Sequence, residues 1–376
     1  MRNAPAHGRI ICAHGRIGDV EGERLYIKAG EQLQSMRVHT ALRLFERAEQ
    51  AHYDPDSCAA GRWDCRMLLG DFEAAWRESD LIARRGNPDP HRFWDGQPFA
   101  DRRVLIRCLH GLGDTIQFIR YAPLIGEQAK TLTVEAQPAL KALLEQARIA
   151  DQIITWGEPE PDWDQQIEIV ELPRVFRTTV KSVPSRIPYL TVCDDGVDVK
   201  RGPKLRVGLV WGCSSFNPER SIRLKELGNL LTIPGVSFFS LQAGPQRAEL
   251  EPWSSQVHDL YNGSFCVLPA ARNLMTLDLV ISVDTMMAHL AGAMGRPVWT
   301  LLPYRCDWRW MMKRVDSPWY PTMRLFRQNR SGEWRSVIRQ VEQALRTLIR
   351  EANFESHHWR QCLPARRVSA AEAQEV

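Results

Sequence analysis

Short apolar runs that alternate with helical patterns continue through most of the chain. The clearest example begins at residues 279–283, a β-branched run typical of a strand buried on both faces. Asp284 and Thr285 follow where this strand stops. The pattern then predicts a helix over 286–294 and a second buried strand over 298–302. Together these residues form a strand–turn–helix–strand unit.

The turn of this unit lies at the carboxyl end of a parallel strand, where open α/β sheets bind ligands. Asp284 or Thr285 can cap the helix, and the free N–H groups of its first turn form a natural anion site. His289 lies on the same helix face as Thr285, and Gly292 allows close backbone packing. The pattern predicts a phosphate-binding turn, although it also fits an ordinary capped helix with a surface or core histidine.

A second strand–turn–helix unit occurs earlier in the chain. Residues 104–109 predict a strand and residues 115–125 an amphipathic helix. Gly111 and Gly113, in the turn between them, permit close approach or positive φ, and Asp114 stands at the helix start. The third glycine of a dinucleotide fingerprint is missing, and no ribose-binding acid follows at the right distance. A dinucleotide enzyme is therefore disfavoured.

The same alternation predicts two α/β domains, at 100–190 and 204–350, joined by a Pro- and Asp-rich linker at 182–202. We expect further strands at 132–136, 152–154, 167–170, 204–211, 236–242 and 257–260, with helices at 138–146, 221–231, 267–275 and 334–350. Binding sites of such paired domains lie in the cleft between them.

Residues 23–92 predict a helical segment that ends in a Pro-rich turn. Residues 38–42 align with residues 72–76 at an offset of ~34 residues, the tetratricopeptide period. About two degenerate repeats fit, fewer than the three that usually stand alone. We therefore expect this segment to depend on the next domain for its stability. It would serve either as a docking surface for a partner protein or as a structural cap.

Composition excludes several classes of protein. The 376 residues, 44% hydrophobic and 25% charged, suit two to three globular domains, and the net charge of +4 does not favour nucleic acid. No run approaches the ~18 apolar residues of a membrane span. Nine cysteines without a C-x-x-C pair indicate a reduced cytoplasmic protein with no zinc site. Residues 1–22 are expected to be disordered or loosely attached, and 351–376 to form a tail with only a weak metal signal in His357, His358 and Cys362.

Several segments match one family in both order and spacing: HGLGDTIQFIRYAPL at 110–124, VGLVWG at 207–212, SVDTMMAHLAGAMGRPVWTLLP at 282–303, DWRW at 307–310 and SPWYPTMRLFRQ at 317–328. The chain resembles the heptosyltransferase-like glycosyltransferases (carbohydrate-enzyme family nine), and more closely their relatives with N-terminal tetratricopeptide repeats. The resemblance implies an α/β GT-B fold, in which two Rossmann-like domains face a cleft after a short α-helical repeat segment. It also implies transfer of a hexosyl or heptosyl group from a nucleotide-sugar donor.

The resemblance places the family's catalytic base on Asp114, where the plain alternative is a helix cap. It places the donor phosphate on Asp284, Thr285 and His289, with Gly292 in the same helix. Helix dipole and side chains would then carry the leaving-group charge, so no metal and no cofactor are expected. Other candidate donor or acceptor contacts are Gly111, Gly113, Trp211, Arg220, Gln242 and Arg309.

The chain departs from the family at two places. Relatives commonly carry Lys where this chain has Ala243, and their Asn-rich loop is shortened here to 212–220. If that Lys neutralises donor phosphate, Arg220 or Arg223 must substitute, or donor affinity falls. A nearby stretch holds Arg305 and Arg309 among aromatic residues that either stack on sugar and base or pack in the core, namely Trp308, Trp310, Trp319 and Tyr320.

The leading hypothesis is an inverting glycosyltransferase with Asp114 as base and a glycan, lipid-linked or protein acceptor. A non-catalytic docking protein with a vestigial cleft is the alternative, and a nucleotide-sugar epimerase or hydrolase of the same fold is the third. We expect a cytoplasmic location, with peripheral attachment to the inner face of the membrane as a variant of it.

Overall fold

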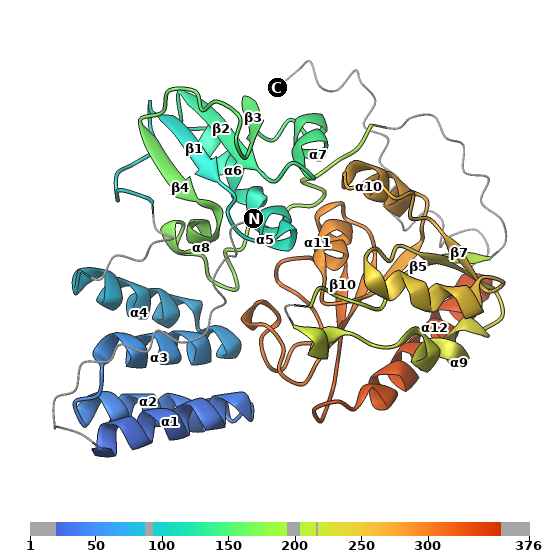
Figure 1. Cartoon of the computed structure of the whole chain (residues 1–376), viewed down its shortest axis with the longest axis horizontal. Helices are drawn as coiled ribbons and strands as arrows, with labels where there is room; N and C mark the ends of the chain where they lie inside the picture. The colour runs from blue at the N-terminus through green and yellow to red at the C-terminus, as the bar shows by residue number, and fades with distance from the viewer. Residues whose placement is uncertain (1–19, 87–92, 194–203, 216, 355–376) are drawn as a thin grey trace. The chain divides into compact units, whose positions relative to one another are not determined.

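The computed structural model describes residues 20–86, 93–193, 204–215 and 217–354, which belong to two compact units that divide between Asn87 and Pro88 (Figure 1). Predictions made for residues 1–19, for the Pro-rich turn at 87–92, and for residues 194–202 and 355–376, including His357, His358 and Cys362, lie outside the described residues.

The first unit consists of four helices: α1 (Val20–Gln34), α2 (Val38–Gln50), α3 (Pro55–Leu69) and α4 (Phe72–Arg84). Asp54 and Asp71 cap α3 and α4 by accepting from the backbone N–H groups three residues on, at 2.7 and 3.2 Å. The first residues of α2 and α4, Val38 and Phe72, are separated by the predicted 34-residue offset. Two successive helix pairs are therefore present, and their assignment as tetratricopeptide repeats stays a prediction.

Close packing holds these four helices together. A Cβ at Gly61 of α3 would lie 2.5 Å from the Phe45 ring of α2, so only glycine fits there. Arg62, which is buried, pairs with Glu78 of α4 at 2.8 Å and with Glu49 of α2 at 2.5 Å. The arginine thus joins three helices, and its charge is balanced inside the unit.

The second unit begins with a small parallel sheet in the order β3-β2-β1-β4. Its strands are β1 (Arg103–Arg107), β2 (Thr131–Ala136), β3 (Gln152–Thr155) and β4 (Gln165–Glu168), and its helices are α5 (Leu112–Phe118), η1 (Ile119–Tyr121), α6 (Ala122–Gly126), α7 (Lys141–Gln146), η2 (Ile169–Glu171) and α8 (Leu172–Val175). We call residues 93–193 the N-lobe. Its strand order reverses between β1 and β4, so the loops after these two strands open a crevice at the carboxyl edge.

The rest of the second unit, residues 204–354, is the C-lobe, built on a parallel sheet in the order β10-β9-β8-β5-β6-β7. Its strands are β5 (Leu205–Val210), β6 (Val236–Ser240), β7 (Val257–Asp259), β8 (Leu279–Val283), β9 (Val298–Leu302) and β10 (Met323–Arg327). The helices are η3 (Pro218–Arg220), η4 (Leu224–Leu227), α9 (Gly228–Leu231), η5 (Pro245–Trp253), α10 (Leu268–Met275), α11 (Met286–Ala293), η6 (Trp308–Trp310) and α12 (Trp334–Phe354). This is the doubly wound Rossmann order, with its reversal between β5 and β8.

The two Rossmann-like lobes confirm the predicted GT-B fold. α5 of the N-lobe packs directly against α11 of the C-lobe, and the two helices lie side by side in Figure 1. Both helices follow a strand at a point where the strand order reverses. The two carboxyl edges that we expected to carry ligands therefore face each other.

Three predicted elements differ from those observed. The helix predicted over 115–125 is broken into α5, η1 and α6, and the one predicted over 221–231 is reduced to η4 and α9. The helix predicted over 138–146 begins only at Lys141. β10 was missed, because its exposed Arg324 interrupts the apolar pattern on this edge strand. Proline and glycine near these breaks explain the first two errors, since Pro123 lies inside the first segment and Gly228 inside the second.

Candidate functional site

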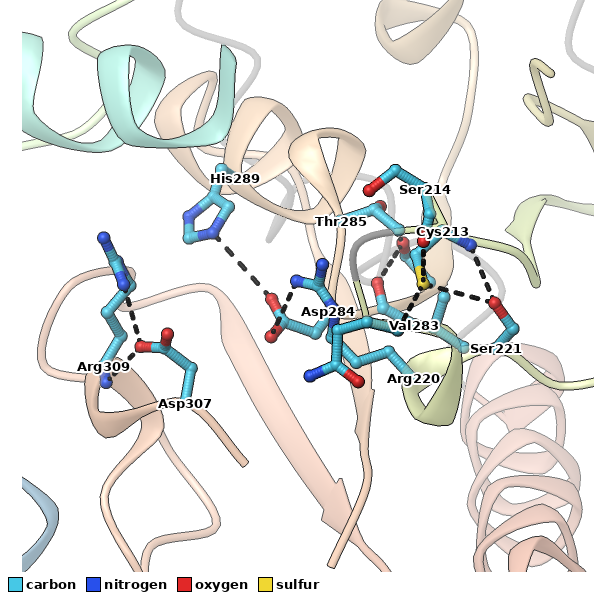
Figure 2. A network of polar contacts seen from close by, with 12 residues as sticks. Cys213, Ser214, Arg220, Ser221, Val283, Asp284, Thr285, His289, Asp307 and Arg309 are labelled. Atoms are coloured by element: carbon cyan, nitrogen blue, oxygen red, sulfur yellow. Dashed lines mark hydrogen bonds and ion pairs between the residues drawn. The ribbon is translucent and has the colours of Figure 1, made fainter. Parts of the chain in front are cut away.

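The turn after β8 lies beside the loop after β5, at the reversal point of the C-lobe sheet. β5 and β8 are hydrogen-bonded neighbours, and the chain leaves them through Trp211 and Asp284 respectively. Figure 2 shows Asp284 facing both His289 and Arg220, which comes from the first of these loops, with Thr285 next to Asp284 in the turn. The residues that the sequence predicted for donor phosphate are thus brought together in one place.

Thr285 occupies the N-cap position of α11, but its side chain does not cap the helix. Its hydroxyl lies 3.0 Å from the hydroxyl of Ser282 instead. In the described part of the chain, no acceptor reaches the backbone N–H groups of Met286 and Met287. The first turn of α11 therefore offers open N–H groups at the positive end of its dipole, as anion binding requires.

Asp284 is only 3% exposed and points toward two basic side chains. Its carboxylate lies 3.5 Å from Nη1 of Arg220 and 4.0 Å from Nε2 of His289 (Figure 2). Burial raises the pKa of Asp284, and the charge of Arg220 opposes this rise. Of the two arginines predicted to replace the missing lysine, Arg220 lies at the site, whereas Arg223 is exposed.

His289 is buried in α11, one turn beyond Thr285. Burial, assisted by the positive charge of Arg309, lowers its pKa to about 3. The imidazole is therefore neutral at pH 7. Its Nδ1 lies 2.9 Å from the hydroxyl of Tyr320, and its ring stacks on Trp310 at 5.3 Å between centroids.

Asp114 is the third residue of α5 and belongs to the N-lobe side of the site. One carboxylate oxygen accepts from the backbone N–H of Gly111 at 3.0 Å, which closes the turn that both glycines form. The other accepts from Nη2 of Arg309 in the C-lobe at 2.5 Å. Asp114 thus completes a capping box at the start of its helix, and its role as base stays a prediction.

All three nitrogens of Arg309 donate hydrogen bonds, and two of these bonds connect the two lobes. It donates to Asp114, to Gln117 of α5 at 2.8 Å and to Asp307 at 2.9 Å. Burial acts to lower the pKa of Arg309, but Asp307 and Asp114 outweigh it and raise the pKa. Burial likewise acts to raise the pKa of Asp307, yet Arg309 holds it below its usual value. Both groups are therefore ionised across the physiological range.

The two lobes also approach each other closely at Gly113. A Cβ on this residue would lie 3.2 Å from Cδ2 of His289 and 3.7 Å from the Cα of Met286. Glycine at this position brings the start of α5 against the first turn of α11. The Asp114 carboxylate and the predicted phosphate turn consequently belong to one continuous site.

Trp211 and Gln242, two other residues predicted to contact donor or acceptor, bond to each other within the C-lobe. Trp211 is fully buried, and its backbone N–H donates to Oε1 of Gln242 at 3.0 Å. The same oxygen accepts from Gly212 at 2.8 Å, while Nε2 of Gln242 donates to the carbonyl of Ala243 at 2.7 Å. Gln242 therefore joins the ends of β5 and β6, and in this structure its amide is used to shape the loops.

The aromatic stretch packs mainly in the core. Trp310, Trp319 and Tyr320 are at most 1% exposed, whereas Trp308 is half-buried beside the guanidinium of Arg309. The Cζ of Arg309 lies 4.8 Å from the Trp308 ring centroid. Of the two interpretations of this stretch, core packing holds for the three buried rings.

Glu168 belongs to the site, although the sequence did not single it out. It ends β4, next to β1, and is fully buried. Its carboxylate accepts from the backbone N–H groups of Leu109 at 3.2 Å and Val170 at 2.6 Å. Burial raises the pKa of Glu168 to about 8. In the sequence it lay inside the strand predicted over 167–170, and nothing there marked it as a site residue.

Among the described residues there is neither a helix that could span a membrane nor a candidate metal cluster. None of the described helices is long and apolar enough to span a bilayer. Within the described ranges, no three His, Cys, Asp or Glu side chains form a group that could hold a metal ion.

No protein-family model matches the chain. Among curated proteins it is similar to Protein FlbA of Caulobacter vibrioides, with 25% identity over an alignment 406 residues long. This alignment covers 90% of this chain. The match covers 66% of the length of that relative.

Two solved structures share the fold. A family 9 glycosyl transferase from Veillonella parvula has 13% identity and a TM-score of 0.50, covering 68% of this chain and 99% of its own. The E. coli ADP-heptose lps heptosyltransferase II has 13% identity and a TM-score of 0.51, covering 67% of this chain and 99% of its own. At this identity the likeness shows the GT-B fold of the second unit.

Proposed function

We propose that this chain is a metal-independent, inverting glycosyltransferase that moves a sugar from a nucleotide-sugar donor to a hydroxyl acceptor. The observation that carries the proposal is the contact between the start of α5 and the first turn of α11. It brings a carboxylate from one lobe next to open helix N–H groups from the other. These are the two functions that sugar transfer needs, a proton acceptor and an anion site.

The donor pyrophosphate would bind at the first turn of α11. The N–H groups of Met286 and Met287 and the hydroxyl of Thr285 would donate to its oxygens. Arg220 adds the positive charge that the family's lysine would supply, since it already lies 3.5 Å from Asp284 at this turn. Neutral His289 would donate to the leaving diphosphate as its negative charge grows.

Asp114 would remove the proton from the acceptor hydroxyl as that oxygen attacks the anomeric carbon from the face opposite the diphosphate. The carbon–oxygen bond to the diphosphate breaks as the new glycosidic bond forms, so the configuration inverts. The carboxylate lies in the first turn of α5, at the positive end of the helix dipole. Arg309 keeps Asp114 oriented and must share it with the acceptor during the reaction.

The donor nucleotide is proposed from the fold relative named for ADP-heptose, which makes ADP-linked sugars the first donors to test. The acceptor would be a glycan, a lipid-linked saccharide or a protein, and the four-helix unit would bind a partner protein or support the second unit. The matching relative FlbA has no chemistry in its name and therefore does not choose among these.

One observation favours the docking protein as a second candidate. In this structure both carboxylate oxygens of Asp114 are occupied, one by the backbone of Gly111 and one by Arg309. A vestigial cleft would retain such contacts for stability alone.

Calorimetric titration with ADP, GDP, UDP and their common sugar derivatives tests the proposal. We expect one nucleotide to bind selectively, and Thr285→Val to weaken it because the hydroxyl lies at the anion site. Thr347→Val is the matched control, since this hydroxyl bonds to the Gln343 carbonyl on α12. If no nucleotide or nucleotide-sugar binds the wild type, the transferase proposal fails and the docking protein replaces it.

Asp114→Asn separates binding from chemistry. The amide keeps the size of the side chain but cannot take a proton, so transfer should fall by about 10²- to 10⁴-fold, as is typical for loss of a general base. Nucleotide binding should stay within a few-fold of wild type. Equal transfer rates in the variant and the wild type would remove Asp114 from the mechanism.

A further inference from the structure

Tyr320 is buried beside α11, where a glycine makes room for its ring. A Cβ on Gly292 would lie 2.5 Å from ring atoms of Tyr320, closer than any side chain tolerates. Gly292 lies three residues after His289 on the same helix, so the tyrosine reaches the face that carries the imidazole. Its hydroxyl ends 2.9 Å from Nδ1 of His289.

We propose that Tyr320 is a positioning residue that donates its O–H to Nδ1 of His289 and thereby fixes the imidazole with its proton on Nε2. A neutral imidazole carries one N–H, and the partner of one nitrogen decides which nitrogen has it. With the proton on Nε2, the ring presents a donor to an anion at the first turn of α11. The inference rests on the proposed function for the identity of that anion as the donor diphosphate.

The surroundings of the second nitrogen support the same tautomer. Nε2 lies 4.0 Å from the carboxylate of Asp284, and Cδ2 beside it faces Gly113 across the lobe boundary. An N–H directed toward a carboxylate is attracted to it, whereas a nitrogen lone pair is repelled. Stacking on Trp310 and contact with Tyr320 hold the ring in this orientation.

The other tyrosine close to Tyr320 uses its own proton elsewhere. The hydroxyl of Tyr189 donates to the Ile116 carbonyl at 2.9 Å and accepts from Nη2 of Arg120 at 2.8 Å. Tyr189 therefore has no proton to give to Tyr320, but its oxygen interacts with the Tyr320 hydroxyl and competes with Nδ1 of His289 for that proton. The Cζ of Arg120 lies 4.7 Å from the centroid of the Tyr320 ring, and this positive charge makes the nearby hydroxyl a stronger donor.

The test is ¹⁵N NMR of protein labelled only at histidine, with the His289 ring assigned by the signal that disappears in His289→Asn. We expect the wild-type ring to carry its proton on Nε2 and none on Nδ1. In Tyr320→Phe, which keeps the ring, both nitrogen resonances should shift and the second tautomer should appear. Tyr121→Phe is the control, because it removes a buried hydroxyl that bonds to Thr178 and not to histidine.

A proton on Nδ1 in the wild type overturns the inference. It is also overturned if the His289 ring nitrogens of Tyr320→Phe resonate at the same positions as those of the control Tyr121→Phe. Titration with the selected nucleoside diphosphate separates this outcome from failure of the proposed function. Tyr320→Phe should weaken its binding about tenfold if His289 donates to the diphosphate. If the proton is on Nε2 but no nucleotide binds, the positioning role of Tyr320 stands and the transferase proposal fails.

Discussion

The burial of Glu168 predicts an unusual dependence of stability on pH. The residue is fully buried at the end of β4, where burial raises its pKa from 4.5 to about 8. In the unfolded chain the carboxyl ionises near its ordinary pKa. Between these two values the folded state holds a proton that the unfolded state has released.

The sign of the effect follows from this difference. The folded state binds more protons, so the contribution of Glu168 to the free energy of unfolding is complete below pH 4.5 and is lost as pH rises through about 8. A difference of ~3.5 pKa units corresponds to roughly 5 kcal/mol at most. The two backbone N–H groups that bond to the carboxylate reduce this figure, because they favour the ionised form.

Glu168→Gln removes the titration but preserves the side-chain shape. Urea unfolding at pH 5, 6, 7 and 8 should show wild type losing several kcal/mol relative to this variant across the range. Asp164→Asn is the control, because Arg103 lowers the pKa of Asp164 and its contribution is lost only in acid. It should therefore leave the slope between pH 5 and 8 unchanged. If Glu168→Gln and wild type lose stability in parallel over this range, Glu168 is not protonated in the folded protein.

Two further predictions concern the phosphate site and the helical unit. Arg220→Gln should weaken nucleoside diphosphate binding about tenfold in calorimetry, since it removes the charge at the first turn of α11. The exposed Arg223→Gln is its control, and equal losses in both variants would reject a specific contact. In the first unit, Gly61→Ala should reduce the free energy of unfolding by about 1–3 kcal/mol, because its Cβ enters the Phe45 ring. Gly30→Ala meets no atom within 4 Å and should stabilise α1 by up to about 1 kcal/mol, so a thermal melt in which the two variants agree would contradict this packing.

Sequence patterns identified most of this fold, because buried parallel strands are short, apolar and separated by helices. Of the ten strands among the described residues, nine overlap a predicted strand, β4 with a shift of two residues, and the edge strand β10 was missed. The helices were predicted less well. The segments 115–125 and 221–231 have helical periodicity, but proline and glycine divide them into short α and 3₁₀ turns.

The sequence predicted the two turns that carry the candidate site, but not that their side chains meet in a single site. Asp114 and Arg309 are 195 positions apart, and their ion pair depends on the approach of two lobes that each fold around a separate sheet. The resemblance assigned Asp114 a role as base without indicating its partner. Glu168 carried no signal in the sequence, where it lay inside the strand predicted over 167–170, because its protonation depends on burial that only the folded N-lobe creates.

The glycines show where local sequence reasoning reaches its limit. Gly113 and Gly292 both suggested close backbone approach, and a ligand was the expected neighbour of the first. In the folded chain the absent side chains make room for two residues of the protein, His289 beside Gly113 and the Tyr320 ring beside Gly292. Because Tyr320 also contacts His289, both glycines determine the surroundings of the same imidazole. An alanine at Gly113 would therefore press on His289 directly, and one at Gly292 would act on it through Tyr320.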